Sequence, residues 1–266
     1  MLRRFEHRSG AVGLRSALLA ELGIPHVFTT RIGPGGSDLC VRDLDPGARA
    51  FLTDALDVPR ELPLARARQV HAATALVVGP DGPPGGHSRS NAGPARPAPL
   101  PRGDVDGDAL VTSTARAALM VYTADCVPVL VASSDGRRVA AIHAGWRGLV
   151  AGVIEAALVH FEGPGAVAAI GACLSRERCE MGPEVAERFV DAGLGAVVHP
   201  GPGDRARVDV RQAARLQLER GGVARIDVAD GCTWTDQALF HSHRRDVTHG
   251  NRARAGSLGA LIAVRR

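Results

Sequence analysis

Two histidines and one cysteine occur in local sequences that suit a metal site. His71 ends the segment Arg-Gln-Val-His, Cys126 lies in Thr-Ala-Asp-Cys-Val-Pro, and His143 lies in Ala-Ile-His-Ala-Gly-Trp. Each comes at or near the end of an apolar segment, where a rigid strand can hold a side chain in a cleft. Two imidazoles and a thiolate suit zinc, and three protein ligands leave a fourth tetrahedral position open, as in catalytic zinc sites.

The same residues also fit a site without a metal. Taken singly, each histidine is most simply a surface or satisfied polar group, and Cys126 a small buried apolar residue. Cys126 and His143 lie at the ends of consecutive predicted strands, so we expect their side chains to meet. Cys126 would then be a thiolate nucleophile and His143 its base. Spacing alone leaves metal binding and thiol catalysis both open.

A glycine-rich turn follows His143 and predicts an anion site. The turn contains Gly145, Arg147 and Gly148 and leads from a predicted strand into a predicted helix. Backbone N–H groups at the positive end of a helix suit a phosphate or carboxylate, and an arginine adds a forked donor. An ordinary tight turn with a surface arginine is the simpler alternative. Further candidates for the same anion are Arg31, Arg244 and Arg245.

A charged segment near the C-terminus, residues 240–246, contains the chain's one His-x-His pair, His241 and His243. Such a cluster is either a solvated loop or a loop that faces a substrate. A blue copper with a trinuclear cluster needs many more imidazoles arranged in several such pairs. The sequence therefore disfavours a multicopper oxidase mechanism.

The elements that must position these residues follow from apolar patterning and turn signals. The patterning predicts strands over 26–30, 74–78, 109–112, 119–123, 127–132, 139–143, 167–170, 225–228 and 258–264, and helices over 48–56, 149–161, 183–190 and 209–220. We expect the four strands between 109 and 143 to be adjacent, and the 149–161 helix to begin near Gly145. Asp209 is the expected N-cap of the last helix. Residues 79–102, rich in Pro and Gly, predict a mobile surface insertion.

Composition narrows the class of protein. With 266 residues, 45% apolar and 3% aromatic, the chain is large enough for one α/β domain. Five cysteines without CxxC spacing predict free thiols in a reducing compartment. No apolar run reaches about 18 residues and no signal peptide is evident, so we expect a cytoplasmic protein without membrane contact. The +4 net charge comes from arginines interleaved with carboxylates, which disfavours a nucleic-acid partner.

In combination and order, the motifs resemble those of the laccase-domain proteins. This family was first described as multicopper polyphenol oxidases, is now regarded mainly as purine nucleoside phosphorylases, and includes peptidoglycan editing factors. The resemblance spans most of the chain and is carried by Thr29-Thr-Arg31, Gln69-Val-His71, Gly107-Asp-Ala-Leu-Val111, Thr123-Ala-Asp-Cys-Val-Pro128, His143-Ala-Gly-Trp-Arg-Gly148, Ile170-Gly171, Glu180-Met-Gly182, Cys232-Thr233 and Ser242-His-Arg-Arg-Asp246.

The resemblance implies a single domain over 1–266 with an α/β (α+β) fold, a four-layer α/β/β/α sandwich of mixed sheets. It implies that His71, Cys126 and His143 bind Zn²⁺ and surround a nucleoside. The implied activity is phosphorolysis of adenosine, inosine, guanosine and methylthioadenosine, together with adenosine deamination. Its partners would be purine nucleosides and phosphate, and the protein a monomer or small homo-oligomer.

Three other functions compete with this one. The first is a hydrolase that uses Cys126 and His143 on an amide or a peptidoglycan precursor. The second is a non-enzymatic metal-binding or interaction module whose site is a relict. The third, copper-dependent polyphenol oxidation, ranks lowest.

Overall fold

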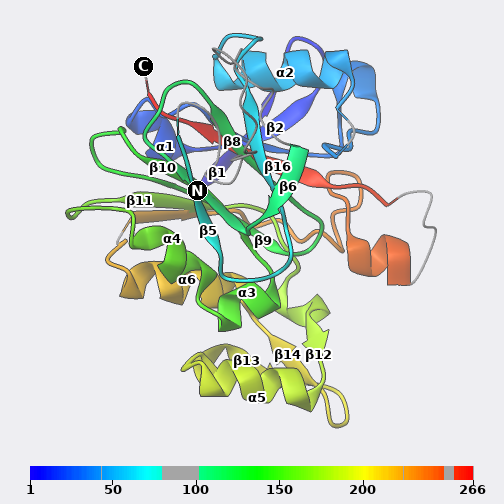
Figure 1. Ribbon diagram of the computed structural model, residues 1–266. Helices are drawn as coiled ribbons and strands as arrows, with labels where there is room; N and C mark the ends of the chain where they lie inside the picture. The colour runs from blue at the N-terminus through cyan, green and yellow to red at the C-terminus, as the bar shows by residue number, and fades with distance from the viewer. Residues whose placement is uncertain (43, 80–101, 224, 249–254, 266) are drawn as a thin grey trace, which may run out of the picture.

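Two mixed β-sheets lie face to face between helices in a computed structural model of the protein (Figure 1). The structure describes residues 1–42, 44–79, 102–223, 225–248 and 255–265. The insertion predicted over 79–102 lies almost entirely outside the described residues. Among the described residues, no helix is long and apolar enough to cross a membrane. All five cysteines are free thiols, as predicted.

The first sheet has seven strands in the order β1-β2-β3-β16-β8-β4-β6. Its strands are β1 (Leu2–Glu6), β2 (Val12–Ser16), β3 (His26–Thr29), β16 (Leu258–Ala263), β8 (Ala118–Thr123), β4 (Leu64–Arg68) and β6 (Arg102–Asp106). The pairs β8–β4 and β4–β6 are parallel, and the other pairs are antiparallel. Strands from both ends of the chain therefore build its centre.

The second sheet has six strands in the order β15-β11-β9-β10-β7-β5. They are β15 (Arg225–Val228), β11 (Val167–Ile170), β9 (Val127–Ala132), β10 (Val139–Ala144), β7 (Ala109–Thr112) and β5 (Ala75–Val78). Every residue of β9 and of β10 is buried. Such continuous apolar strands are covered on both faces.

Three apolar clusters separate four layers. The middle cluster lies between the two sheets, where Leu119 and Ile262 of the first sheet share a core with Leu130 and Val167 of the second. On the outer face of the seven-stranded sheet lies α2 (Pro46–Leu56). The outer face of the six-stranded sheet packs against α4 (Val153–Leu158) and α6 (Val210–Arg220), beside α3 (Trp146–Val150). The predicted four-layer α/β/β/α sandwich is therefore confirmed.

Smaller elements complete the chain. The short α1 (Ala17–Glu21) packs beside β11 and β15. A three-stranded sheet forms with α5 (Pro183–Asp191) a projection below α3 in Figure 1, and its strands are β12 (Glu180–Met181), β14 (Ala206–Val208) and β13 (Val198–Pro200). One-turn 3-10 helices span Pro34–Gly36, Arg176–Arg178 and Gly195–Val197, and a π-helical turn spans Arg244–Thr248.

Two predictions about the elements are wrong. The strand expected over 119–123, observed as β8, does not join its sequence neighbours but pairs with β16 and β4 in the facing sheet. The apolar pattern reports burial, and it does not say which of two packed sheets a strand enters. The helix expected over 149–161 is two helices, α3 and α4, because Gly152 between them has a left-handed φ of 81°.

Most other boundaries agree with the pattern, and the misses share a cause. The strands over 109–112, 127–132, 167–170 and 225–228 occur as predicted. The Asp209 carboxylate caps α6 by accepting from the Gln212 N–H at 2.9 Å, also as predicted. Sequence patterning missed β1, β2, β4, β6 and the three-stranded sheet. These strands are short or arginine-rich, so their apolar alternation is weak.

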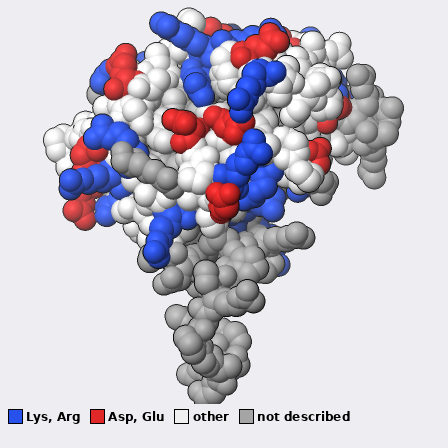
Figure 2. Space-filling view, turned by 90° about the horizontal axis from the view of Figure 1, so that it is seen from above, with Lys and Arg blue, Asp and Glu red and all other residues white. Residues whose placement is uncertain are grey.

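The charged side chains on the upper face are of both signs. Figure 2 shows arginines and carboxylates interspersed across the face seen from above. Among the ion pairs of the described residues, Arg8 and Asp54 pair at 2.8 Å and Arg31 pairs with Asp38. The charge on this face is therefore largely balanced locally.

Candidate metal centre and substrate cleft

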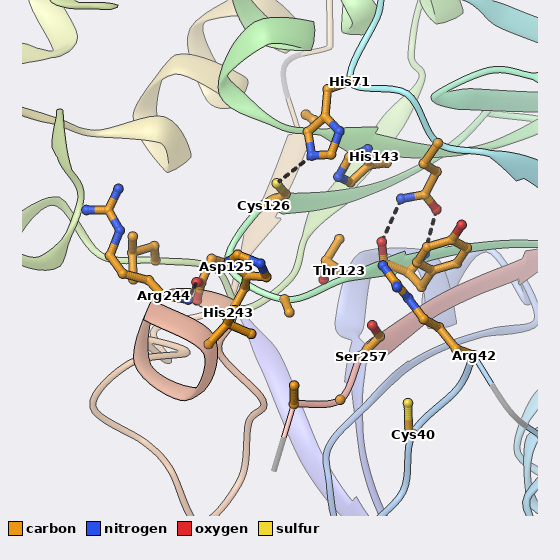
Figure 3. Close-up of a pocket in the computed structure, with 18 of the residues that line it drawn as sticks. Cys40, Arg42, His71, Thr123, Asp125, Cys126, His143, His243, Arg244 and Ser257 are labelled. Carbon is orange, nitrogen blue, oxygen red and sulfur yellow. Dashed lines mark hydrogen bonds between the residues drawn. The ribbon is translucent and has the colours of Figure 1, made fainter. Parts of the chain in front are cut away.

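Strand pairing brings the three predicted ligands together (Figure 3). His143 is the penultimate residue of β10, which runs antiparallel to β9 with His143 opposite Pro128. Cys126 comes directly before β9, so it lies beside His143, as predicted. His71 lies in the turn between β4 and β5, and its ring packs edge-on against that of His143 with centroids 4.8 Å apart.

The geometry of the three ligand atoms fits a small metal ion. These atoms all lie within 4.8 Å of one another, and Cys126 Sγ is 3.9 Å from His71 Nε2. Tetrahedral zinc with ordinary bond lengths separates sulfur from nitrogen by about 3.6 Å and two nitrogens by about 3.4 Å. A slight closing of the three side chains therefore completes three sides of a tetrahedron. This His-Cys-His cluster can hold a metal ion.

Asp108 holds both histidines in place. Its carboxylate, which is buried, accepts a 2.7 Å hydrogen bond from His143 Nδ1, which leaves Nε2 of His143 as the ligand atom. The backbone N–H groups of Val70, His71 and Ala72 donate to the same carboxylate at 2.7–3.2 Å. These bonds stabilise His71 in a left-handed conformation, with φ of 61°. A carboxylate behind a histidine ligand fixes the tautomer and the orientation of the ring.

Sequence reasoning did not assign a role to Asp108. The signal was present, because the residue directly precedes the fully buried strand β7. A buried carboxylate must be paired or hydrogen-bonded, so its position predicts a partner but not which one. Only the fold shows that the partners belong to two metal-ligand segments.

Gly145 leaves the space that the ligands occupy. A Cβ atom at this position would lie 2.8 Å from Cδ2 of His71 and 3.1 Å from Sγ of Cys126. Both distances are shorter than ordinary van der Waals contact. The glycine that follows β10 therefore allows the backbone to approach the metal cluster closely.

The electrostatics favour a thiol that is protonated until a cation binds. Burial raises the pKa of the Cys126 thiol to about 12, and the charge of Asp125 adds to the effect. Burial also lowers the pKa of His71, with a further lowering from His143. His71 is then neutral at physiological pH, as a metal ligand must be, and a bound metal ion would deprotonate the thiol.

Asp125 joins the metal cluster to the C-terminal loops. Its backbone has an unusual φ of 91° for a residue other than glycine. Its side chain accepts from Thr233 Oγ1 at 2.6 Å and from the backbone N–H of Arg244 at 2.7 Å. Hydrogen bonds to two other segments therefore hold Asp125, beside Cys126, in its strained backbone conformation. Strained residues at functional sites are commonly held in this way.

The cluster opens into a cleft of about 1790 Å³ between the seven-stranded sheet, α2 and the C-terminal loop. This volume exceeds the roughly 300–1,000 Å³ of an ordinary small-molecule site. Along with the three ligands, the part of the lining that the structure describes includes Arg42, Arg49, Arg66, Arg68 and Arg244 and two carboxylates, those of Asp45 and Asp125. The cleft is therefore mainly cationic, in contrast to the balanced face in Figure 2.

The structure separates the predicted anion-binding arginines. Arg244 lines the cleft, where its guanidinium donates to the carbonyls of Arg178 and Glu180. Arg31 and Arg245 are not among the lining residues. Arg31 pairs with Asp38 and donates to Gln237, so its guanidinium is engaged elsewhere.

Arg245 acts within its own loop. Its guanidinium pairs with Asp246 and donates to the carbonyls of Thr233, Trp234 and Phe240. These contacts stabilise the π-helical turn. Arg245 therefore has a structural role and does not face the substrate cleft.

The glycine-rich turn after His143 leads into a shorter helix than its sequence indicates. Gly145 is the N-cap of α3, but α3 has only five residues. The amides at 145–148 and the turn's arginine remain predicted phosphate ligands. Arg147 is exposed and lies over the Trp146 ring at 4.3 Å, and Trp146 itself lines the cleft.

The sequence matches the family described as Multi-copper polyphenol oxidoreductase laccase over residues 47–265. A purine nucleoside phosphorylase from Deinococcus radiodurans is 34% identical over 269 residues, covering 96% of this chain and 93% of that protein. Purine nucleoside phosphorylase YfiH from Escherichia coli is 41% identical over 152 residues, or 55% of this chain and 61% of YfiH. The match therefore spans less than two thirds of the length of YfiH.

Solved structures share the fold. A Neisseria meningitidis protein has a TM-score of 0.71 and 27% identity, with 91% of this chain and 95% of that one covered. YlmD from Geobacillus stearothermophilus has a TM-score of 0.73 and 24% identity, with 98% and 99% covered. With the His-Cys-His cluster in its cleft, the chain belongs to the multi-copper polyphenol oxidoreductase laccase family, as its motifs predict.

Proposed function

We propose that the protein is a zinc-dependent purine nucleoside phosphorylase. The observation that carries this proposal is the cluster of His71, Cys126 and His143, fixed by Asp108 and open to a cationic cleft. The names of the relatives in Deinococcus radiodurans and Escherichia coli support it. Adenosine, inosine, guanosine and methylthioadenosine are the proposed substrates.

The chain's own residues would position the reactants. The nucleoside would lie against the wall formed by Thr123, Ala124 and the metal ligands, and the attacking phosphate beside Arg244. Arg147, which follows the cleft-lining Trp146 in the chain, would supply a second positive charge near His71. Holding two reactants in fixed orientation and placing cations where negative charge gathers are the main sources of rate in such a transfer.

Zinc, when bound, would polarise a substrate oxygen or lower the pKa of a water molecule, chemistry that also serves deamination of adenosine. The residues fit it, since a neutral imidazole pair and one thiol form a common zinc ligand set with an open fourth position. Asp108 would keep His143 in the tautomer that presents Nε2.

The test combines metal analysis with product analysis. Purified protein is expected to contain about one zinc per chain and to release adenine from adenosine only when phosphate is present. Formation of inosine would add deamination. A metal-free protein with full activity would exclude the zinc role, and adenine release that ignores phosphate would exclude phosphorolysis. Reconstitution with copper, followed by a phenol-oxidation assay, tests the oxidase alternative on the same sample.

A second candidate is a thiol hydrolase acting on an amide or a peptidoglycan precursor. The hydrogen bond from His143 to Asp108, with Cys126 beside the ring, has the arrangement of a nucleophile, a base and an orienting carboxylate. The raised pKa of Cys126 opposes it, because little thiolate is present without a cation. Rapid alkylation of Cys126 by iodoacetamide, unaffected by added zinc, would favour the hydrolase.

A further inference from the structure

Two arginines in the cleft have guanidinium groups without an ion-pair or hydrogen-bond partner among the described residues. Arg42 and Arg66 both line the cleft, and neither side chain forms an ion pair or a hydrogen bond with the described residues. The other three lining arginines each have a partner, although Arg244 uses only its Nη1. Arg49 donates to the carbonyls of Arg60 and Leu62, Arg68 pairs with Asp106, and Arg244 donates to the carbonyls of Arg178 and Glu180.

Arg42 and Arg66 belong to one face of the seven-stranded sheet. In β4, Ala65 and Ala67 point into the core between the sheets, so Arg66 points to the opposite face. Tyr122, on the adjacent strand β8, packs on that same outer side. The Arg42 guanidinium lies over the Tyr122 ring, 4.9 Å from its centroid. Arg42, Arg66 and Tyr122 therefore line the cleft together on this outer face.

The position of Tyr122 is itself fixed. The Gln69 side chain donates to the Tyr122 carbonyl at 2.7 Å and accepts from the Tyr122 N–H at 2.9 Å. Gln69 lies two residues before His71, so one segment supports both the aromatic ring and a metal ligand. The spacing between the ring and the metal cluster is thereby set by a rigid part of the sheet.

This pair of arginines lies away from the phosphate position proposed above. Figure 3 shows Arg42 and Arg244 on opposite sides of the cleft, with Thr123 and Asp125 between them. Asp45, a described carboxylate near α2 that lines the cleft, is the N-cap of that helix and accepts from the Ala48 N–H at 2.8 Å. A cleft of about 1790 Å³ has room for a substrate that extends from the metal ligands to Arg42.

We propose that Arg42 and Arg66 bind a phosphate monoester carried by the substrate, so that the cleft accepts nucleoside 5′-phosphates in preference to free nucleosides. The proposal rests on the proposed function for the placement of the nucleoside at the metal end. Two guanidinium groups match the double charge of a phosphate monoester and present forked donors to its oxygens. The Tyr122 ring keeps one of them in place without neutralising it.

Calorimetric titration of the zinc-loaded protein with adenosine 5′-monophosphate and with adenosine tests the subsite. The monophosphate is expected to bind about tenfold more tightly, since hydrogen bonds to charged groups are the strong ones. Arg42→Gln and Arg66→Gln should each remove most of that preference and leave adenosine affinity unchanged. Arg137→Gln, in an exposed turn, is the matched control. In the unaltered protein, added salt should weaken the binding of the monophosphate and leave the binding of adenosine unchanged.

The possible outcomes separate this subsite from the reaction. Equal affinity for both ligands would overturn the subsite, and so would variants that lose adenosine and monophosphate alike. A raised KM for inorganic phosphate with unchanged monophosphate affinity would overturn it too, because the arginines would then hold the attacking phosphate. Monophosphate binding that depends on Arg42 and Arg66, in a protein that cleaves no nucleoside, would support the subsite and exclude the phosphorylase.

Discussion

The two ends of the cleft are built on different principles. At the metal end, buried Asp108 accepts from His143 and from the backbone of the His71 turn, so the ligands have little freedom. At the other end, Arg42 is exposed and Arg66 half-buried, and neither has an ion-pair partner among the described residues. The difference shows that ligands requiring exact geometry are held by buried hydrogen bonds, whereas groups that capture an anion are left uncommitted.

The largest effect should come from removing the thiol at the metal end. Cys126→Ala is expected to lose the metal and to lower kcat/KM by about 10³-fold, since a bound metal ion contributes several kcal/mol to the transition state. Metal analysis and phosphorolysis rates on one preparation measure both losses. Cys40→Ala, which changes a cysteine at the other end of the cleft, is the control. If activity survived without metal, the metal end would not be the reaction centre.

The loop that carries Arg244 should depend on a buried ion pair. Burial raises the pKa of the Asp246 carboxyl, but hydrogen bonds from Arg245 and from the Ser242 N–H together hold it below its ordinary value of 3.8. Because the folded-state pKa is the lower one, the pair stabilises the protein above the ordinary pKa of 3.8. That contribution is lost as the pH falls through the folded-state pKa.

Asp246→Asn should therefore lower the free energy of unfolding by about 3 kcal/mol at neutral pH, as when one partner of a buried pair is removed. Urea unfolding at pH 7 and at progressively lower pH measures the difference, which should shrink toward zero in acid. Asp204→Asn, in an exposed turn, is the control. A difference independent of pH would mean that packing, not charge, holds the loop.

Asp108 offers a sharper test of preorganisation at the metal end. Asp108→Asn keeps the shape of the side chain but removes one acceptor oxygen from the bonds to Val70, His71 and Ala72. Metal affinity should fall about 10- to 100-fold, the usual loss when a carboxylate behind a histidine ligand is changed. Competition with a chromogenic chelator measures it. Unchanged metal affinity in a folded variant would show that the metal ligands keep their positions without the Asp108 carboxylate.

The smallest expected effect concerns the space beside the ligands. Gly145→Ala would place a methyl group against His71 and Cys126, so we expect metal affinity to fall by about tenfold while the fold persists. Gly195→Ala is the matched control, because its Cβ would meet Val190 at an ordinary 3.6 Å. Thermal unfolding of both metal-free proteins shows whether the change is local. Equal affinities would mean that the ligand side chains can shift freely.

Much of the fold was accessible from patterning, and the errors have physical causes. The fully buried strands β7, β9 and β11 have unbroken apolar sequences bounded by turns, which patterning detects. The strand β8 has the same kind of sequence, so nothing local shows that it belongs to the facing sheet. The strand β4 has arginines at two of its five positions, so its apolar pattern was too short to recognise.

The sequence by itself determined the candidate ligands, because His71, Cys126 and His143 stand in distinctive motifs at strand ends. Their motifs also determined the family. Only the tertiary structure decided that Asp108 supports two ligand segments, that Arg31 and Arg245 are engaged away from the cleft, and that Arg42 and Arg66 face into it. The physical reason is that such roles depend on contacts between residues far apart in the chain, which strand pairing creates and local sequence does not record.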